Sequence, residues 1–433
     1  MKAPDAVDLE GSGQAMPAPL RVTVVQDGSR LHYGLPVGLK LAGVLGTVHT
    51  DWFVRSRSLE AAAAMAMARF GGATGRRLAG RRCAALDGSR VIASGWRALF
   101  ARLLENGAVL PERTFVRRSQ AMTRRVLADG WRGANVLAGF VRNLDPDLCR
   151  AARQDGLAVV LDQMIAPIDI QMLEEARQAE LWPEWQSAPE RGAEIMRGIK
   201  QRSWAFANHI TCASDYVRDG LLAAGLCRDR ISVIPYPVDA TAFSLCDRRH
   251  RHGPIVVGFV GGVSLRKGAP AFFDIARAFD PTKVRFVMVG PILADPALVE
   301  RRRGAVDVIG SVPRADVRAW LERFDILLFP SACEGSAGAV MEAMATGLPI
   351  VTTPNSGTPV RYGVEGFVVG CEDLAGMADH VARLARDDDL RMRLGMAARS
   401  RVEQLTVRGY GEAWAGLLRQ VLAGNGGGGS LQA

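Results

Sequence analysis

The chain has 433 residues, of which 48% are hydrophobic and 23% are charged. This length allows two to three domains, and the composition is typical of a folded globular protein rather than a disordered one. The seven cysteines are scattered and form no Cys-x-x-Cys pair, so the sequence predicts neither a disulfide framework nor a zinc site and favours a reducing cytoplasm. No stretch reaches the roughly 18 to 20 apolar residues of a membrane-spanning helix, and the acidic start does not resemble a secretion signal.

Basic residues are concentrated in one region. The net charge is +9, and residues 55–125 contain 15 arginines against four acids. A solvated arginine-rich face is the ordinary interpretation of such a segment, and a surface for anionic lipid headgroups or a phosphorylated substrate is the more specific one. Few aromatic residues accompany these arginines and no nucleic-acid-binding motif is visible, so we expect no nucleic acid as a partner.

The first half of the chain predicts buried strands and intervening helices. Apolar, β-branched runs at residues 20–27, 134–140 and 157–164 predict strands. The segment 58–125 is rich in Ala, Leu and Arg and predicts mostly helix, and a polar helical region follows at 172–206.

The next helix has clear boundary signals. A predicted strand at 207–214 ends at Ser214 and Asp215, which we expect to cap the following helix, and Gly225 should stop that helix. Residues 231–239 then predict another strand and a loop.

After a polar linker the alternation becomes regular. Strands are predicted at 255–262, 283–290, 305–312, 325–331 and 348–354, and helices at 269–279, 314–324 and 338–347. Apolar strands alternating with helices are typical of a parallel sheet covered on both faces. The sequence therefore predicts two α/β domains, whose ligands should bind at the carboxyl ends of the strands.

The motif most indicative of chemistry is "FPSACEGSAGAVMEAMATGLPIV" at residues 329–351. A strand, a loop of small residues and a helix start let a ligand approach the backbone, and amides at a helix start favour an anion. Glu334 and Glu342 suit hydroxyl-rich groups on either side of a diphosphate, because carboxylates would repel the phosphate itself. A solvated pair of glutamates is the alternative for this spacing taken alone.

These residues match a Glu-x7-Glu signature, and the surrounding sequence resembles the family-4 retaining glycosyltransferases. The segment "GFVGGVSLRKGAPAFF" at residues 258–273 is similar to the phosphate loop of that family, and residues 213–225 and 231–243 resemble its interdomain segment. The similarity is good over residues 205–375 and loose over the first 200 residues.

The resemblance implies the GT-B fold, in which two Rossmann-like parallel-sheet domains face each other across an interdomain cleft. It assigns the acceptor to the first domain and a nucleoside diphosphate sugar to the second. The predicted boundaries are a flexible tail at 1–19, the acceptor-binding domain at 20–242, a linker at 243–254, the nucleotide-sugar-binding domain at 255–405, a terminal helix at 406–422 and a flexible Gly-rich tail at 423–433.

The resemblance also implies roles for individual residues. Arg266 and Lys267 would neutralise the donor diphosphate, Glu334 would hold the donor sugar, and Glu342 would hold the ribose; an ordinary exposed lysine is the alternative for Lys267. The other donor-binding residues are expected in the two loops and in the turn beside the base: Gly261, Gly262, Ile309, Gly310, Ser336, Ala337, Gly338 and Ala339. The nucleotide-sugar is a substrate, and neither a metal ligand nor a cofactor is expected.

This chain departs from the family pattern at several positions. Gly262 stands where the family often has arginine, and Arg266 is expected to supply that charge. The stretch "NSGTPVRYGVEG" at 355–366 replaces the usual Gly-Gly-x-Pro-Glu, so no donor-selecting contact is transferred. Gln163 stands where a histidine is frequent; it could hydrogen-bond the sugar but could not act as a base.

Three further residues are candidates on the acceptor side. His32 follows the first predicted strand, His49 lies in an acceptor-side loop, and Asp51 could orient an acceptor hydroxyl. Each also has an ordinary alternative, a packing histidine or a turn aspartate, that needs no function.

The sequence therefore predicts a metal-independent, retaining glycosyltransferase of the hexosyltransferase type, acting in envelope or exopolysaccharide glycan synthesis. A carbohydrate or lipid-linked acceptor is expected, together with a cytoplasmic location and peripheral contact with the inner face of the membrane through residues 55–125. Two alternatives remain: a nucleotide-sugar epimerase of the same architecture, and a non-catalytic protein that binds a nucleotide or an anionic surface.

Overall fold

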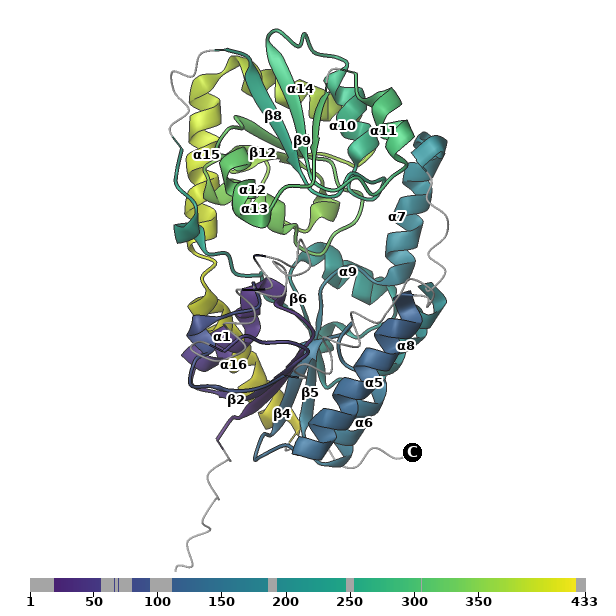
Figure 1. The fold of residues 1–433 in the computed structure, drawn as a ribbon, viewed down its shortest axis with the longest axis vertical. Helices are drawn as coiled ribbons and strands as arrows, with labels where there is room; N and C mark the ends of the chain where they lie inside the picture. Colours follow the sequence, from purple (N-terminus) through teal and green to yellow (C-terminus); the bar gives the residue numbers. More distant parts are fainter. Residues whose placement is uncertain are drawn as a thin grey trace, which may run out of the picture.

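The computed structural model describes residues 19–55, 66, 69, 80–93, 111–185, 193–246, 253–304 and 306–425. These residues form two α/β domains, one above the other in Figure 1. Most of the two predicted tails, much of the linker and most of the arginine-rich segment lie outside the described residues.

The N-terminal domain is built on a parallel sheet of seven strands in the order β3-β2-β1-β4-β5-β6-β7. The strands are β1 (Val22–Gln26), β2 (Leu45–Thr50), β3 (Arg90–Ala93), β4 (Val136–Phe140), β5 (Ala158–Gln163), β6 (His209–Cys212) and β7 (Ile231–Val233). Every residue of β1, β4 and β5 is buried, as expected of central strands covered on both faces.

The C-terminal domain has a parallel sheet of six strands in the order β10-β9-β8-β11-β12-β13. The strands are β8 (Ile255–Val260), β9 (Val284–Val289), β10 (Val306–Gly310), β11 (Ile326–Phe329), β12 (Ile350–Thr352) and β13 (Gly366–Val368). The prediction of two parallel-sheet α/β domains is confirmed. The strands β2, β3 and β13 were not predicted.

Helices cover the faces of both sheets (Figure 1). They are α1 (Gly34–Leu41), α5 (Pro111–Asp129), α6 (Pro146–Gln154), α7 (Ile168–Leu181), α8 (Ala193–Phe206), α9 (Asp215–Ala223), α10 (Ala269–Ala276), α11 (Pro296–Arg302), α12 (Arg314–Leu321), α13 (Gly338–Ala345), α14 (Leu374–Arg386), α15 (Asp388–Glu403) and α16 (Val407–Asn425). The predicted cap is confirmed for Ser214, whose hydroxyl accepts from the amide of Val217, whereas Asp215 is the first helical residue. Gly225 follows the end of α9 with a φ of 89°.

Two elements connect the domains besides the linker. In Figure 1, α7 rises from the lower domain beside the upper one. After it, Trp182 and Trp185 lie in the hydrophobic core of the C-terminal domain, and the Trp182 indole donates to Asp274 at 2.7 Å. At the other end of the chain, α16 returns to the N-terminal domain, where Trp414 is fully buried in a core that includes β1 and α1 residues.

The crossing of α1 and α16 depends on two glycines. A Cβ atom at Gly411 would lie 2.0 Å from the carbonyl oxygen of Gly38, whereas a Cβ atom at Gly416 on the same helix would meet nothing within 4 Å. We expect Gly411→Ala to lower the free energy of unfolding by roughly 1–3 kcal/mol through overpacking. The matched control Gly416→Ala should raise it by up to about 1 kcal/mol through helix propensity. Urea unfolding measures both, and equal stabilities would contradict the close crossing.

Candidate functional site

The loop after β8 is held against the loop after β11. Gly268 has a φ of 76°, and a Cβ atom there would lie 1.8 Å from the carbonyl oxygen of Pro330, so only glycine fits. The backbone oxygen of Arg266 accepts from the amide of Ala332 at 2.9 Å and from the hydroxyl of Ser331 at 3.2 Å. These bonds bring the two candidate cations beside the loop that carries Glu334.

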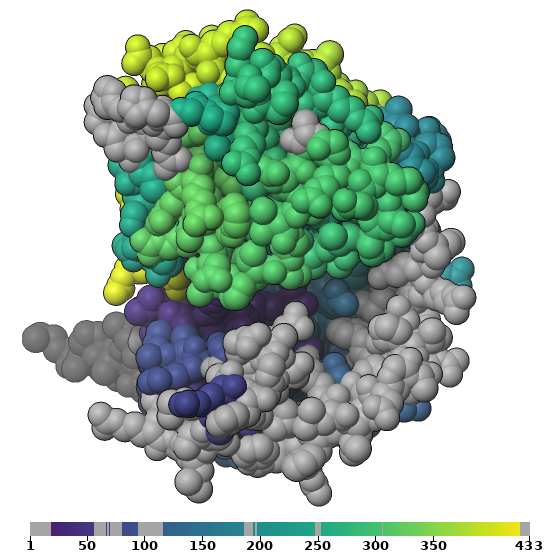
Figure 2. Space-filling view, turned by 45° about the horizontal axis from the view of Figure 1, so that its top comes forward, coloured from purple at the N-terminus to yellow at the C-terminus, as the bar shows by residue number. Residues whose placement is uncertain are grey.

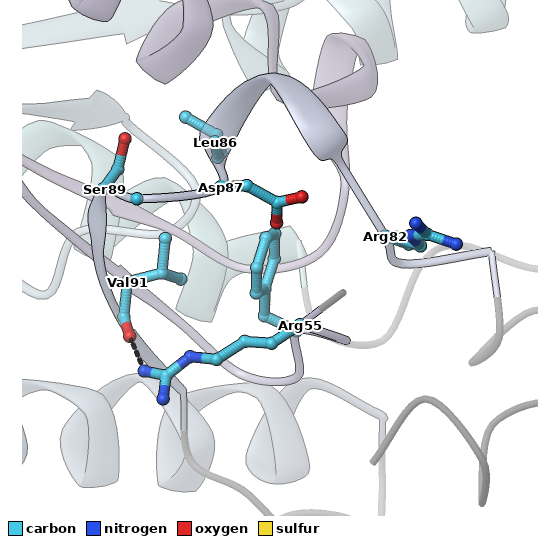
Figure 3. Close-up of a pocket in the computed structure, with 8 residues that line it drawn as sticks. Arg55, Arg82, Leu86, Asp87, Ser89 and Val91 are labelled. Carbon is cyan, nitrogen blue, oxygen red and sulfur yellow. Dashed lines mark hydrogen bonds between the residues drawn. The ribbon is translucent and has the colours of Figure 1, made fainter. Parts of the chain in front are cut away.

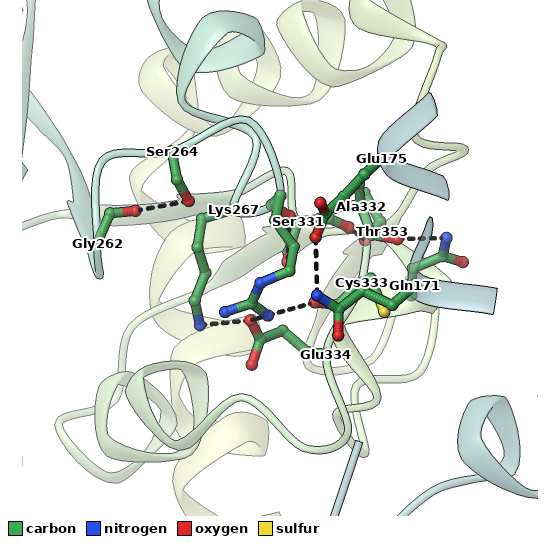
Figure 4. A network of polar contacts seen from close by, with 12 residues as sticks. Gln171, Glu175, Gly262, Ser264, Lys267, Ser331, Ala332, Cys333, Glu334 and Thr353 are labelled. Carbon is green, nitrogen blue, oxygen red and sulfur yellow. Dashed lines mark hydrogen bonds and ion pairs between the residues drawn. The ribbon is translucent and has the colours of Figure 1, made fainter. Parts of the chain in front are cut away.

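Arg266, Lys267 and Glu334 form one cluster, and Figure 4 shows Lys267 pointing toward Glu334. Arg266 Nη1 and Lys267 Nζ each lie 2.5 Å from Glu334 Oε1, and the side chains are 27%, 18% and 13% exposed, respectively. Burial lowers the pKa of Lys267, and the nearby Glu334 carboxylate acts in the opposite direction. Because one carboxylate faces two cations, the cluster keeps an excess positive charge that an anionic ligand can use.

The start of α13 lies next to this cluster in the chain. A Cβ atom at Gly338 would meet nothing within 4 Å, which leaves room for a ligand at the helix start. The amide of Ala337, one residue earlier, is already used, because it donates to the carbonyl oxygen of Ser356 at 3.1 Å. Ser336 and Ala339 flank these two residues in the chain. Open space beside helix amides is suited to an anion.

Gly335 has a different role, because it makes contact with the other domain. A Cβ atom at Gly335 would lie 1.6 Å from the carbonyl oxygen of Met164, which follows β5. The carbonyl oxygen of Gly335 also accepts from the Ser214 hydroxyl at 2.6 Å. These two contacts hold the loop that carries Glu334 against the carboxyl edge of the N-terminal sheet.

The turn expected beside the base lies at the end of β10. Ile309 is 40% exposed and Gly310 has a φ of 81°. Leu293, which the sequence did not single out, is 65% exposed and lies close to Gly262, where an added Cβ atom would lie 2.5 Å from Leu293 Cδ1. Leu293 and Ile309 are therefore solvent-exposed apolar side chains at this edge of the sheet.

Glu342 is joined to the N-terminal domain through an arginine that the sequence did not single out. Arg314, at the start of α12, donates to Glu342 at 2.6 Å and to Nε2 of His32 at 2.9 Å. Burial lowers the pKa of His32, and the charge of Arg314 adds to this effect. A neutral His32 that accepts at Nε2 carries its proton on Nδ1. The only sequence signal for Arg314 was its place directly after a predicted strand and Pro313.

The loop that presents His32 has an unusual backbone. Leu31, His32 and Tyr33 all have positive φ values, of 49°, 51° and 63°. Such left-handed conformations cost roughly 1–3 kcal/mol each and tend to occur at functional sites. Asp51 supports this loop, because its carboxylate accepts a hydrogen bond from the amide of Gly28 at 2.9 Å.

Asp51 is itself half-buried and held by an ion pair with Arg81. Burial acts to raise the pKa of Asp51, but the charge of Arg81 and hydrogen bonds to the carboxylate hold it below its usual value. The structure thus places Asp51 beneath the loop after β1, as a support for that loop.

The two other acceptor-side candidates lie inside the N-terminal domain. His49 is completely buried on β2, 3.8 Å from Asp129, and neither of its ring nitrogens has a hydrogen-bond partner among the described residues. Gln163 is 1% exposed; its amide donates to the carbonyl of Ile165 at 2.7 Å and accepts from the Trp204 indole at 3.2 Å.

Asp162, which the sequence did not single out, precedes Gln163 at the same sheet edge. It is fully buried, accepts from Thr211 at 3.0 Å and is hydrogen-bonded by the Tyr236 hydroxyl. Burial raises the pKa of Asp162 to about 7. Its sequence signal was an acid within an otherwise apolar strand.

A hollow between the domains is visible in Figure 2, bounded by green C-terminal residues above and purple N-terminal residues below.

A separate cavity, of about 540 Å³, lies at the β3 side of the N-terminal domain (Figure 3). It is lined by Phe53, Arg55, Arg82, Leu86, Asp87, Gly88, Ser89 and Val91. None of the donor-site candidates lines it.

Neither a metal-binding cluster nor a membrane-spanning helix is present among the residues that the structure describes. No three His, Cys, Asp or Glu side chains of that part of the chain are grouped so that they could hold a metal ion. Among the described helices, none is long and apolar enough to cross a membrane.

Comparison with known sequences identifies the C-terminal domain. Residues 254–387 match the family model described as Glycosyl transferases group 1. The amylovoran biosynthesis glycosyltransferase AmsK of Erwinia amylovora is 27% identical over 202 residues, which are 42% of this chain and 49% of that protein. The putative colanic acid biosynthesis glycosyltransferase WcaL of Escherichia coli K12 is 29% identical over 206 residues, 44% of this chain and 51% of that protein. The chain spans about half the length of the curated relatives it matches.

Solved structures identify the fold of the whole chain. A sucrose-phosphate synthase from Thermosynechococcus elongatus has a TM-score of 0.65 at 15% identity, with 94% of this chain and all of that chain covered. Anabaena HepE in complex with UDP and glucose has a TM-score of 0.57 at 14% identity, covering 92% of this chain and 99% of that one. The resemblance to glycosyltransferases is therefore confirmed for residues 254–387, which match the Glycosyl transferases group 1 model, and the chain has the GT-B fold.

The burial of His49 predicts a pH dependence of stability. Burial lowers the pKa of His49 to about 4, below the value of about 6.5 in an unfolded chain. As the pH falls from about 6.5 towards 4, the unfolded chain takes up this proton first, so the folded state loses stability, by about 3 kcal/mol. We expect His49→Gln to remove this part of the loss, as measured by urea unfolding at several pH values. An unchanged pH profile in the variant would contradict the assignment of His49 to the core.

Proposed function

We propose that this protein transfers a glycosyl group from a nucleoside diphosphate sugar to an acceptor hydroxyl, with retention of the anomeric configuration and without a metal ion. The observation that carries the proposal is the cluster of Arg266, Lys267 and Glu334 beside the open start of α13. The family match of residues 254–387 and the GT-B fold support it. The names of the relatives AmsK and WcaL favour an envelope or exopolysaccharide glycan as the product.

Lys267 and Arg266 would stabilise the diphosphate as it leaves the sugar. The bond between the anomeric carbon and the phosphate oxygen breaks, and negative charge collects on that oxygen. Two fixed cations and helix amides, already in place before the reaction, stabilise this charge without reorganisation. The departing phosphate oxygen can take the acceptor proton, so this mechanism needs no strong protein base. Glu334, held by both cations, would accept hydrogen bonds from the hydroxyls of the donor sugar.

The remaining donor contacts follow from the edge of the C-terminal sheet. Glu342 would accept hydrogen bonds from the ribose, and Arg314, now paired with it, would have to share or release it. Ile309, which is exposed, and the neighbouring Gly310 would lie beside the base. The other donor contacts would be made by backbone at Gly261, Gly262, Ser336, Ala337, Gly338 and Ala339.

The acceptor would bind on the opposite edge, in the N-terminal domain. His32 and Asp51 support this proposal through the braced loop after β1; roles for His49 and Gln163 remain predictions. Closure of the two domains over the substrates would exclude water, because hydrolysis competes with transfer. A cytoplasmic location, a carbohydrate or lipid-linked acceptor, contact with the membrane through residues 55–125, and the absence of a cofactor are parts of the same proposal.

The role of Lys267 can be tested by removing its charge. We expect Lys267→Ala to reduce turnover of the donor by at least about 100-fold, the scale on which single stabilising groups act in such sites. Lys283→Ala, an exposed lysine of the same domain, should leave turnover unchanged. Turnover is measured with a panel of nucleotide-sugars in EDTA, and NMR of the product gives its anomeric configuration.

An unchanged rate in Lys267→Ala would exclude Lys267 as the group that stabilises the leaving diphosphate. Loss of wild-type turnover in EDTA would refute metal independence, and an inverted product would refute retention. Isomerised sugar without any acceptor would indicate an epimerase instead.

The ribose assignment of Glu342 can be tested with a modified nucleotide. Wild-type protein should bind 2′,3′-dideoxy-UDP about tenfold or more weakly than UDP, because hydrogen bonds to a charged carboxylate are lost. Glu342→Ala should bind both nucleotides with similar, weakened affinity. Glu300→Ala, whose carboxylate is 71% exposed, should behave as wild type in calorimetric titrations. A wild-type preference that persists in Glu342→Ala would place the ribose elsewhere.

A further inference from the structure

Two arginines lie at the carboxyl edge of the N-terminal sheet, outside the donor site. Arg30 follows β1 and Arg142 follows β4, and these strands are hydrogen-bonded neighbours at the centre of the sheet. The amide of Val141, next to Arg142, donates to the carbonyl of Asp162 at 2.9 Å. Ligands of parallel sheets bind at this edge, where neighbouring strands present their loops together.

Within the described part of the chain, one nitrogen of the Arg30 guanidinium lacks a hydrogen-bond partner. Its Nε is buried and has no hydrogen-bond partner among the described residues. Burial lowers the pKa of Arg30, and the positive charge of Arg142 lowers it further, whereas Asp27 and Tyr236 act in the opposite direction. An unmade hydrogen bond and a nearby like charge are both unfavourable, and an anion placed between the two arginines would remove both costs.

The loop that carries Arg30 is held in place and faces the other domain. The buried Gln26 amide donates to the backbone oxygens of Gly28 at 2.9 Å and of Arg30 at 3.2 Å. Two residues further on, His32 accepts from Arg314 of the C-terminal domain. Arg30 therefore lies on the acceptor side of the cleft, on a backbone fixed before any ligand arrives.

On the basis of the proposed glycosyl transfer, we propose that Arg30 and Arg142 bind an oxyanion carried by the acceptor, a phosphate or a carboxylate group. Guanidinium groups are planar and always charged, and they bind both kinds of oxyanion through paired hydrogen bonds. The donor diphosphate is assigned to Arg266 and Lys267 on the other sheet, so the two anions do not compete for the same cations. The subsite restricts the acceptor to an anionic glycan or glycolipid.

The test uses the full chain saturated with UDP, so that the donor site cannot take up the probe. The probes are methyl phosphate and methyl glucuronide, with methyl glucoside as the neutral comparison, and binding is followed by ligand-observed NMR. We expect both Arg30→Gln and Arg142→Gln to weaken binding of an anionic probe about tenfold or more, the scale of one charge-assisted hydrogen bond. Arg150→Gln is the matched control, because Arg150 is 56% exposed on α6 and paired with Asp147.

The outcomes separate this subsite from the proposed function. Binding of an anionic probe that depends on both arginines supports the subsite, and rising salt should weaken it. Equal binding in all variants, no binding of either anionic probe, or equal binding of methyl glucoside would overturn it. Should Arg30→Gln fail to fold, Arg142→Gln still decides, because Arg142 is an exposed residue.

UDP affinity provides the second readout. Arg30→Gln and Arg142→Gln should bind UDP as wild type does, whereas Lys267→Ala should not. Wild-type protein that binds none of UDP, GDP and ADP would refute the proposed function, whereas the subsite is judged by the anionic probes alone. Stronger binding of methyl phosphate assigns the anion to a phosphate such as the one that links a glycan to a lipid, and stronger binding of methyl glucuronide assigns it to an acidic sugar.

Discussion

The contact between Gly335 and the carbonyl of Met164 sets the geometry of the cleft. No side chain fits between these backbones, and the Ser214 hydroxyl fixes the same glycine from the N-terminal side. The residue before Gly335 is Glu334, which holds both candidate cations. A backbone contact between two sheet edges therefore places the proposed leaving-group site directly against the proposed acceptor domain, which is what transfer between two substrates requires.

The two glutamates of the candidate donor site are each held by an opposite charge. Glu334 forms ion pairs with Arg266 and Lys267, and Glu342 forms an ion pair with Arg314. Such pairs keep the side chains in place before a ligand arrives, which reduces the ordering that binding requires. Arg314 also donates to His32, so the glutamate proposed to hold the ribose and the strained loop of the other domain share one arginine.

The positions of the two domains are constrained at more than one place. Trp182 and Trp185 follow a helix of the N-terminal half but pack in the C-terminal core, and α16 at the end of the chain packs on α1 of the N-terminal domain. Each half of the molecule thus contains a segment of the other. Movements that open the cleft have to bend these crossing segments, which favours a hinge motion over free separation.

The sequence by itself determined most of the local elements and the residue types of the loops proposed to bind the donor. Continuous apolar runs define β1, β4, β5 and most C-terminal strands, because buried parallel strands need no polar face. The strands β2, β3 and β13 were not predicted, because β2 is interrupted by Gly, Thr and His and the other two have only four and three residues. Only the tertiary structure decided which side chains meet across the cleft. Arg314 was marked only by its place after a predicted strand and Pro313, and Leu293 and the Arg30–Arg142 pair carry no local signal. Their contacts depend on loops that the fold brings together from separate strands.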